Sequence, residues 1–158
     1  MDSIRIFGYK SFKKLSVQLH PINLLIGANG AGKSNFLFLF EMLGNIYEKR
    51  LGAYVAQVGG VDKLLYQGRK VTDRIAVNLL IAKSEYDLAL LESDGKLIVE
   101  REVVGCYDDV CPLDLVRKNV ITEFQSESSL KDHKEEDLSN YISQIRKFHF
   151  HDTGRRSP

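Results

Sequence analysis

Apolar and polar residues alternate in two short segments near the start of the chain. Residues 3–7 (SIRIF) and 15–19 (LSVQL) both show this period of two, which predicts half-buried β-strands. After His20 and Pro21 the pattern changes, because residues 22–26 (INLLI) are almost continuously apolar. Such a run is typical of a strand that is covered on both faces. We therefore expect two half-exposed strands followed by one buried strand.

A glycine-rich stretch follows, and then a helix is predicted from Lys33 to about Glu48. Apolar residues lie nearly all round this helix, so we expect it to be buried rather than to lie on the surface. The apolar residues that set this pattern are Phe36, Leu37, Phe38, Leu39, Phe40, Met42 and Leu43.

The middle of the chain predicts a strand and a hairpin. Residues 74–82 (RIAVNLLIA) have the pattern of a strand, and residues 85–93 and 96–104 flank Asp94-Gly95. Asp-Gly between two such segments is the strongest short signal for a β-hairpin. Residues 52–60 predict only a linker, because glycines punctuate a weak pattern.

The last third of the chain is less regular. Residues 105–135 are polar and mixed, and we expect a mobile insertion there. Residues 137–148 have apolar positions at helical spacing, and residues 147–152 (KFHFHD) predict the start of another strand. Together these elements predict one α/β domain over residues 1–158, with a mixed sheet and antiparallel hairpins.

Composition and charge narrow the class of protein. Of 158 residues, 44% are hydrophobic and 27% are charged, which is ordinary for a globular domain. The formal net charge is +1, so the chain as a whole lacks a strong basic field for nucleic acid. Cys106 and Cys111 are too few for a disulfide framework or a zinc site. We expect a cytoplasmic protein, because neither a signal peptide nor a membrane-length apolar run is present.

Residues 27–34 read GANGAGKS, which fits the phosphate-binding pattern G-x-x-x-x-G-K-[ST] without a mismatch. Glycine allows the tight backbone curl that brings several N–H groups to one anion, and the following helix points its N-terminus at the same place. We expect Lys33 to reach the β- and γ-phosphates of ATP and the Ser34 hydroxyl to coordinate Mg²⁺. The nucleotide-binding residues predicted in this way are Gly27, Ala28, Asn29, Gly30, Ala31, Gly32, Lys33, Ser34 and Asn35.

The alternative for this stretch is a glycine-rich connection that fits the pattern by chance. A chance fit would rarely fall between an apolar strand and an apolar helix, which is the context that the motif requires.

The flanks of the motif carry a family resemblance. Residues 4–37 (IRIFGYKSFKKLSVQLHPINLLIGANGAGKSNFL) resemble the N-terminal lobe of RecF/SMC-like ABC-type ATPases. Those proteins begin with a short strand, an F-[KR]-S-F turn, a second strand and I-G-x-N-G-x-G-K-S-N. The turn here is YKSF at residues 9–12, and the last asparagine is Asn35. Residues 58–70 (VGGVDKLLYQGRK) and 145–154 (IRKFHFHDTG) are similar to segments of bacterial RecF-like AAA-type ATPases.

Members of this family divide the ATPase site between two halves of a longer chain. The second half supplies an LSGG-like signature, the Walker B acids and a switch histidine, and none of these motifs is visible in this sequence. The nearest acidic candidate, residues 90–94 (LLESD), lies on a predicted hairpin arm. The resemblance therefore implies a truncated lobe that binds MgATP and hydrolyses it poorly.

The resemblance also implies partners. The missing C-terminal half or a second subunit would complete the site. The full-length protein from which this lobe would come, called the parent below, would form an ATP-dependent dimer. A parent of this family implies a role in DNA maintenance or anti-phage defence, with DNA as a candidate partner. Two other classes stay open: an interaction module for nucleic acid or protein with a vestigial phosphate loop, and a metabolic P-loop kinase. The GKSN continuation and the lack of a lid-like arginine cluster disfavour the kinase.

Two smaller groups of residues are ambiguous. Gln67 is a candidate for the family's glutamine that touches Mg²⁺ and the attacking water, or else a surface residue in a turn beside Gly68. Lysines 10, 13 and 14 are interleaved with Tyr9 and Phe12. This cluster predicts either a nucleic-acid contact or a solvated turn whose aromatic rings pack inward.

The histidines near the end of the chain are also ambiguous. His149 and His151 would share one face of a strand, where they could bind zinc with a third ligand that the sequence does not nominate. The alternative is an ordinary strand face. By resemblance, Asp152 and Thr153 approach the nucleotide or the missing half.

Overall fold

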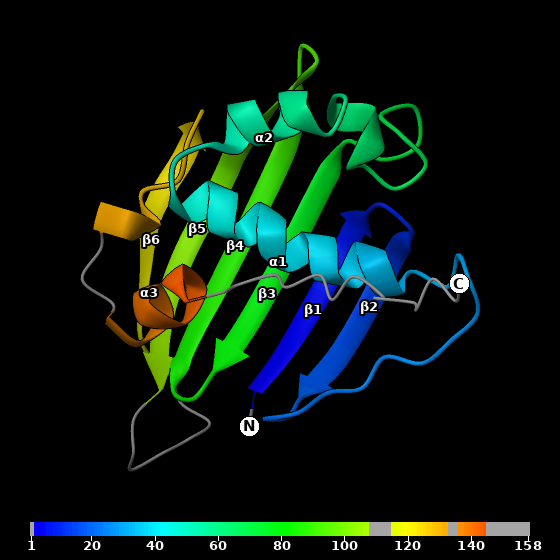
Figure 1. Cartoon of the computed structure of the whole chain (residues 1–158). Coiled ribbons are helices and arrows are strands. Elements are labelled where there is room, and N and C mark those ends of the chain that lie inside the picture. Colours follow the sequence, from blue (N-terminus) through cyan, green and yellow to red (C-terminus); the bar gives the residue numbers. More distant parts are fainter. Residues whose placement is uncertain (1, 108–114, 133–135, 145–158) are drawn as a thin grey trace, which may run out of the picture.

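One six-stranded antiparallel sheet forms the centre of the fold, in the strand order β2-β1-β3-β4-β5-β6 (Figure 1). The structure is a computed structural model, and it describes residues 2–107, 115–132 and 136–144. The strands are β1 (Asp2–Tyr9), β2 (Phe12–Leu19), β3 (Arg74–Ile81), β4 (Ser84–Ser93), β5 (Lys96–Tyr107) and β6 (Leu115–Gln125). Figure 1 shows the helices on one face of this sheet. They are α1 (Lys33–Tyr47), α2 (Leu51–Gln57) and α3 (Glu136–Ser143), with the short 3₁₀ turns η1 (Val61–Lys63) and η2 (Leu130–Asp132).

The core lies between α1 and the sheet. Alternate residues of β3 are buried toward the helices, and the residues between them face the other side. On α1 the buried residues recur at helical spacing, so that one side of the helix packs into the same hydrophobic cluster. The buried residues of the two elements are Ile75, Val77, Leu79 and Ile81 on β3, and Phe36, Leu39, Met42, Leu43 and Ile46 on α1. This packing fixes α1, and therefore the glycine-rich stretch before it, on the sheet.

The predicted hairpin is confirmed. Asp94 and Gly95 join β4 to β5 with φ angles of +51° and +79°, and positive values at both turn residues match the twist of a hairpin. The Glu92 carboxylate accepts a hydrogen bond from the Gly95 N–H at 2.7 Å. Both acids of the LLESD segment therefore belong to this hairpin: Asp94 lies in the turn and Glu92 closes it.

Residues 22–26 do not form the predicted buried strand. The side chains of Ile22, Leu24 and Ile26 are 89%, 81% and 84% exposed. The chain leaves the edge strand β2 through a turn in which the His20 N–H donates to Asn23 Oδ1 at 3.0 Å, and Asn23 Nδ2 donates to His20 O at 2.6 Å. None of the described strands pairs with residues 22–26. The prediction was wrong because a strand needs a hydrogen-bonding neighbour, which an apolar pattern by itself does not provide.

Other sequence predictions differ in part from the structure. The sheet is antiparallel throughout the described residues rather than mixed. Residues 52–60 are not a linker, because α2 occupies most of them and buries Leu51, Tyr54 and Val55. Within residues 105–135 the structure forms β6, paired with β5, and η2, so mobility of this segment stays a prediction.

The segment after β6 is fixed to the sheet by one buried carboxylate. Glu102 accepts hydrogen bonds from the hydroxyls of Tyr86, Thr122 and Ser128, and from the Ser129 N–H. Four donors share two oxygens, which saturates the acceptor capacity of a carboxylate. Because these donors come from β4, β6 and the segment beyond, Glu102 holds three parts of the chain together.

Candidate functional site

The glycine-rich loop, residues 27–32, is curled tightly before α1. Gly30 and Gly32 have φ angles of +84° and +93°, in the left-handed region that favours glycine. The Ala31 N–H donates to the Ala28 carbonyl at 3.2 Å, which closes a turn inside the loop. These two glycines therefore have a conformational role at the positions where the motif requires them.

The N-terminus of α1 opens onto this loop. Gly32 is the N-cap, no side chain caps the helix, and the first turn carries no acidic residue. The first intrahelical bond runs from the Phe36 N–H to the Gly32 carbonyl at 2.9 Å. The N–H groups of the preceding residues have no intrahelical acceptor, and the positive end of the helix dipole lies with them. This geometry suits an anion.

The Lys33 side chain bends back over the loop. Its Nζ donates to the Gly27 carbonyl at 2.6 Å and to the Ala28 carbonyl at 2.7 Å. One ammonium group is thus held across the loop, beside the uncapped helix end. Ser34, the next residue, is exposed, so its hydroxyl is accessible from solvent. Phosphate and Mg²⁺ binding by Lys33 and Ser34 stay predictions.

The turn between β1 and β2 packs closely against the loop. A Cβ atom at Gly32 would lie 2.9 Å from both Phe12 Cε1 and Ser11 Oγ, so the loop backbone approaches this turn closely. Asn35 Nδ2 also donates to Ser11 Oγ at 2.9 Å. The two features that carry the family resemblance, the turn at residues 9–12 and Asn35, therefore contact each other in the fold.

Gln67 lies near the first turn of α1. It has a left-handed backbone, with φ at +56°, and its Nε2 donates to Tyr66 Oη at 3.3 Å. Together with Asn35 it lines a hollow of about 650 Å³, which also contains Lys63 and Lys70. The structure thus brings Gln67 close to the end of the phosphate motif, and its role at Mg²⁺ stays a prediction. Sequence reasoning missed the hollow, because its walls come from distant parts of the chain.

The three lysines of the early turn do not form one cluster. Lys10 lines the hollow beside Asn35, whereas Lys14 lines a different pocket on the helix-free face of the sheet. Tyr9 is buried, and Phe12 packs partly against the core and beneath the glycine-rich loop. Inward-packed aromatic rings agree with the solvated-turn alternative rather than with a stacking platform.

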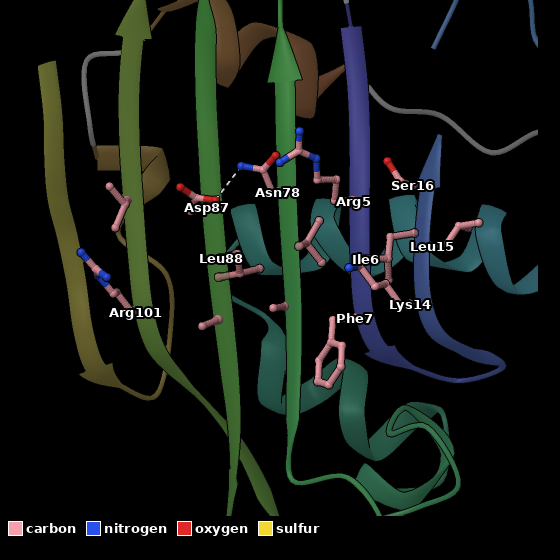
Figure 2. Close-up of a pocket in the computed structure, with 14 residues that line it drawn as sticks. Arg5, Ile6, Phe7, Lys14, Leu15, Ser16, Asn78, Asp87, Leu88 and Arg101 are labelled. Atoms are coloured by element: carbon pink, nitrogen blue, oxygen red, sulfur yellow. Dashed lines mark hydrogen bonds between the residues drawn. The ribbon is translucent and has the colours of Figure 1, made fainter. Parts of the chain in front are cut away.

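The pocket on the helix-free face has a volume of about 690 Å³ (Figure 2). Arg5, Asn78 and Asp87 are aligned across neighbouring strands, and Figure 2 shows them projecting from β1, β3 and β4. Asn78 Nδ2 donates to Asp87 Oδ1 at 2.6 Å and to Glu85 Oε1 at 2.8 Å. The pocket carries charges of both signs and lies across the sheet from α1, so it is separate from the glycine-rich loop.

Clusters of metal-ligating side chains are absent from the described residues. In residues 2–107, 115–132 and 136–144, no group of three or more His, Cys, Asp and Glu side chains could hold a metal ion. No helix within these residues is long and apolar enough to cross a membrane. His149, His151, Asp152 and Thr153 lie outside the described residues, as does the strand predicted at 147–152.

Comparison with protein families matches residues 1–152 to the AAA ATPase domain. No curated protein and no solved structure matches the chain. The family match spans nearly the whole sequence, including the curled loop, α1 and the turn beneath them. The chain therefore belongs to the AAA ATPase domain family, a family of P-loop ATPases.

Proposed function

We propose that this chain binds MgATP through residues 27–35, as the N-terminal half of a RecF/SMC-like ATPase site. The observation that carries the proposal is the Lys33 ammonium held across a curled glycine loop at an uncapped helix N-terminus. The left-handed backbone at Gly30 and Gly32 sets the curl of the loop, and a Cβ at Gly30 would meet nothing within 4 Å, which leaves room there for a phosphate group. The residues present therefore fit the phosphate tail of a nucleotide.

Binding would exchange the partners of Lys33. Its ammonium would leave the carbonyl oxygens of Gly27 and Ala28 and pair with the β- and γ-phosphates. A charged acceptor forms a stronger hydrogen bond with an ammonium than a carbonyl does, so the exchange favours the bound state. The Ser34 hydroxyl would contribute one ligand to Mg²⁺, which neutralises phosphate charge when it is bound with ATP.

Residues 22–26 support the second part of the proposal, that the site is completed by more polypeptide. Ile22, Leu24 and Ile26 lead directly into the phosphate loop and are almost fully exposed. Covering three such side chains contributes about 5–9 kcal/mol. We assign this cover to a C-terminal half of the parent or to a second subunit, which would add a strand here and supply the acidic residues for hydrolysis. In the parent, ATP would then favour association of two lobes in DNA maintenance or anti-phage defence.

This proposal predicts binding with little turnover for the 158-residue chain alone. At an ATP concentration about 100 times Kd, binding adds about 2.7 kcal/mol of stability, which raises Tm by about 5–10 °C. Lys33→Ala should lose most of this shift, and steady-state phosphate release should be equally low for both proteins. Robust hydrolysis that Lys33→Ala abolishes would contradict the incomplete site. The absence of any Tm shift would instead favour an interaction module with a vestigial phosphate loop.

A further inference from the structure

The pocket on the helix-free face of the sheet is a trough built around two small side chains. Ala76 on β3 and Ala89 on β4 are directly opposite each other in the register, and both line this pocket of about 690 Å³ (Figure 2). Alanine is uncommon in strands, and two alanines side by side leave the sheet backbone uncovered. Val77 and Leu88 also line the pocket, although their side chains are buried on the other face. The floor of the trough is therefore the sheet itself.

Longer side chains form the walls of this trough. Phe7 lies opposite Ala76 in the register, and its side chain is 46% exposed, which places an apolar ring beside the floor. Along β3, Asn78 and Arg74 lie two residues to either side of Ala76, so that about 14 Å of strand separates them. An α-helix with its side chains is about 10–12 Å across. The trough is thus wide enough for one helix.

Positive charge surrounds the trough. Arg5, Lys14 and Arg101 line it with exposed side chains, and within the described residues the structure gives none of them an ion pair. Glu123 lies opposite Arg101 in the register, but these two described side chains do not form an ion pair. The acid among the described lining residues is Asp87, whose carboxylate already accepts a hydrogen bond from a neighbouring amide. This surface therefore attracts an acidic partner and repels the same surface of a second copy.

The two outermost cations lie about the length of a short helix apart. Lys14 is on β2 and Arg101 is on β5, in the cross-strand row that also contains Phe7, Ala76 and Ala89. Four strand spacings separate the two cations, which is about 19 Å, and Figure 2 shows them on opposite sides of the pocket. A helix that crosses the strands covers this distance in about 13 residues. On the other face of the same sheet, α1 crosses the strands in this way (Figure 1).

We propose that this trough binds an acidic amphipathic helix of a partner protein. The apolar side of that helix packs on Ala76, Ala89 and Phe7, and acidic side chains about three turns apart pair with Lys14 and Arg101. The apolar floor between the cations favours a helix over a phosphodiester backbone, which is charged along its whole length. The inference goes beyond the proposed function and does not rest on it, because the trough and the phosphate loop lie on opposite sides of the sheet.

Fluorescence anisotropy with a labelled peptide tests this inference, in the absence of nucleotide. The peptide is an alanine-based helix of about 16 residues, with leucines along one face and glutamates about 11 residues apart at the two ends of that face. We expect saturable binding that weakens as the salt concentration rises. Lys14→Gln/Arg101→Gln should lower the affinity about ten-fold, because each exposed ion pair contributes about a factor of three. Ala76→Leu/Ala89→Leu fills the trough and should abolish binding.

A matched control removes the same charge elsewhere. Lys63→Gln/Lys70→Gln changes two exposed lysines of the hollow beside Asn35 and should leave the affinity for the peptide unchanged. A second peptide, with lysines in place of the two glutamates, should not bind. Each variant should keep the wild-type Tm, because none of the changed side chains lies in the buried core.

Several outcomes would overturn the proposal. They are a wild type that does not saturate up to about 1 mM peptide, an unchanged affinity after the trough is filled, and an equal loss in the lysine control. Displacement of the peptide by a DNA duplex would also overturn it, because the trough would then be a nucleic-acid site. So would a dimer of the protein alone that Ala76→Leu/Ala89→Leu dissociates, because a second copy would then occupy the trough.

Discussion

The two left-handed glycines of the phosphate loop permit a sharp test of how the loop is supported. Gly30 and Gly32 have nearly the same φ angle, at +84° and +93°. Their surroundings differ, because a Cβ at Gly30 meets nothing within 4 Å, whereas a Cβ at Gly32 lies 2.9 Å from Phe12 Cε1 and Ser11 Oγ. Alanine at either position is strained, but only alanine at Gly32 also collides with the turn between β1 and β2.

The expected losses of stability follow from the strained backbone and from the collision with the turn. A left-handed backbone costs a non-glycine residue about 1–2 kcal/mol, so Gly30→Ala should destabilise the chain by that amount. Forcing a methyl group into a packed contact adds about 1–3 kcal/mol, which gives about 2–5 kcal/mol in total for Gly32→Ala. Gly44→Ala is a useful control, because Gly44 lies inside α1 with open space around its Cβ. That change should stabilise the chain by about 0.5–1 kcal/mol.

Urea unfolding monitored by circular dichroism measures all three variants. The predicted order of stability is Gly44→Ala, wild type, Gly30→Ala and then Gly32→Ala. Equal losses of stability for the two loop variants would show instead that the collision with Phe12 and Ser11 contributes nothing. A Gly32→Ala protein as stable as the wild type would show that the loop does not rest on this turn.

Two further predictions concern buried polar groups. Glu102→Gln replaces one acceptor oxygen with a donor amide among four donors. The free energy of unfolding, measured by urea titration, should therefore fall by about 2–4 kcal/mol. An unchanged value would contradict the role of Glu102 in holding these parts of the chain together. Burial, followed by the nearby Glu41 charge, raises the pKa of Tyr54 from 10.0 to about 12, and burial also raises the pKa of Tyr9. Because only the unfolded chain then loses these protons just above pH 10, the contribution of these two hydroxyls to the free energy of unfolding should be constant below that pH and fall between pH 10 and 12. A rise over this range, measured by the same titrations, would contradict the burial of these hydroxyls.

The sequence was informative wherever a local pattern decides the structure. The hairpin was predictable from Asp94-Gly95, because few other dipeptides accept two positive φ angles. The helix after the phosphate motif was also predictable, and it ends at Tyr47 rather than at Glu48. α2 was missed, because it is seven residues long, contains Gly52 and depends on tertiary burial of Leu51, Tyr54 and Val55.

The remaining differences depend on contacts between distant residues. The apolar pattern of residues 22–26 predicted burial, but a covering neighbour cannot be deduced from the segment itself. The phosphate motif was visible as a sequence, whereas its support by Ser11 and Phe12 required the fold. The hollow beside Asn35 could not be predicted, because Lys10 and Lys70 line it together only when the segment after η1 is hydrogen-bonded to β1.

Isothermal titration calorimetry with ATP in the presence of Mg²⁺ measures nucleotide binding by this loop. We expect saturable heat with one ATP per folded chain, and a sharp loss of affinity in Lys33→Ala, which lacks the ammonium that spans the loop. Circular dichroism of the same samples establishes that both proteins are folded. Absence of saturable heat from folded wild-type protein, or equal affinities for the two proteins, would contradict the claim that this loop and Lys33 hold the phosphates of ATP.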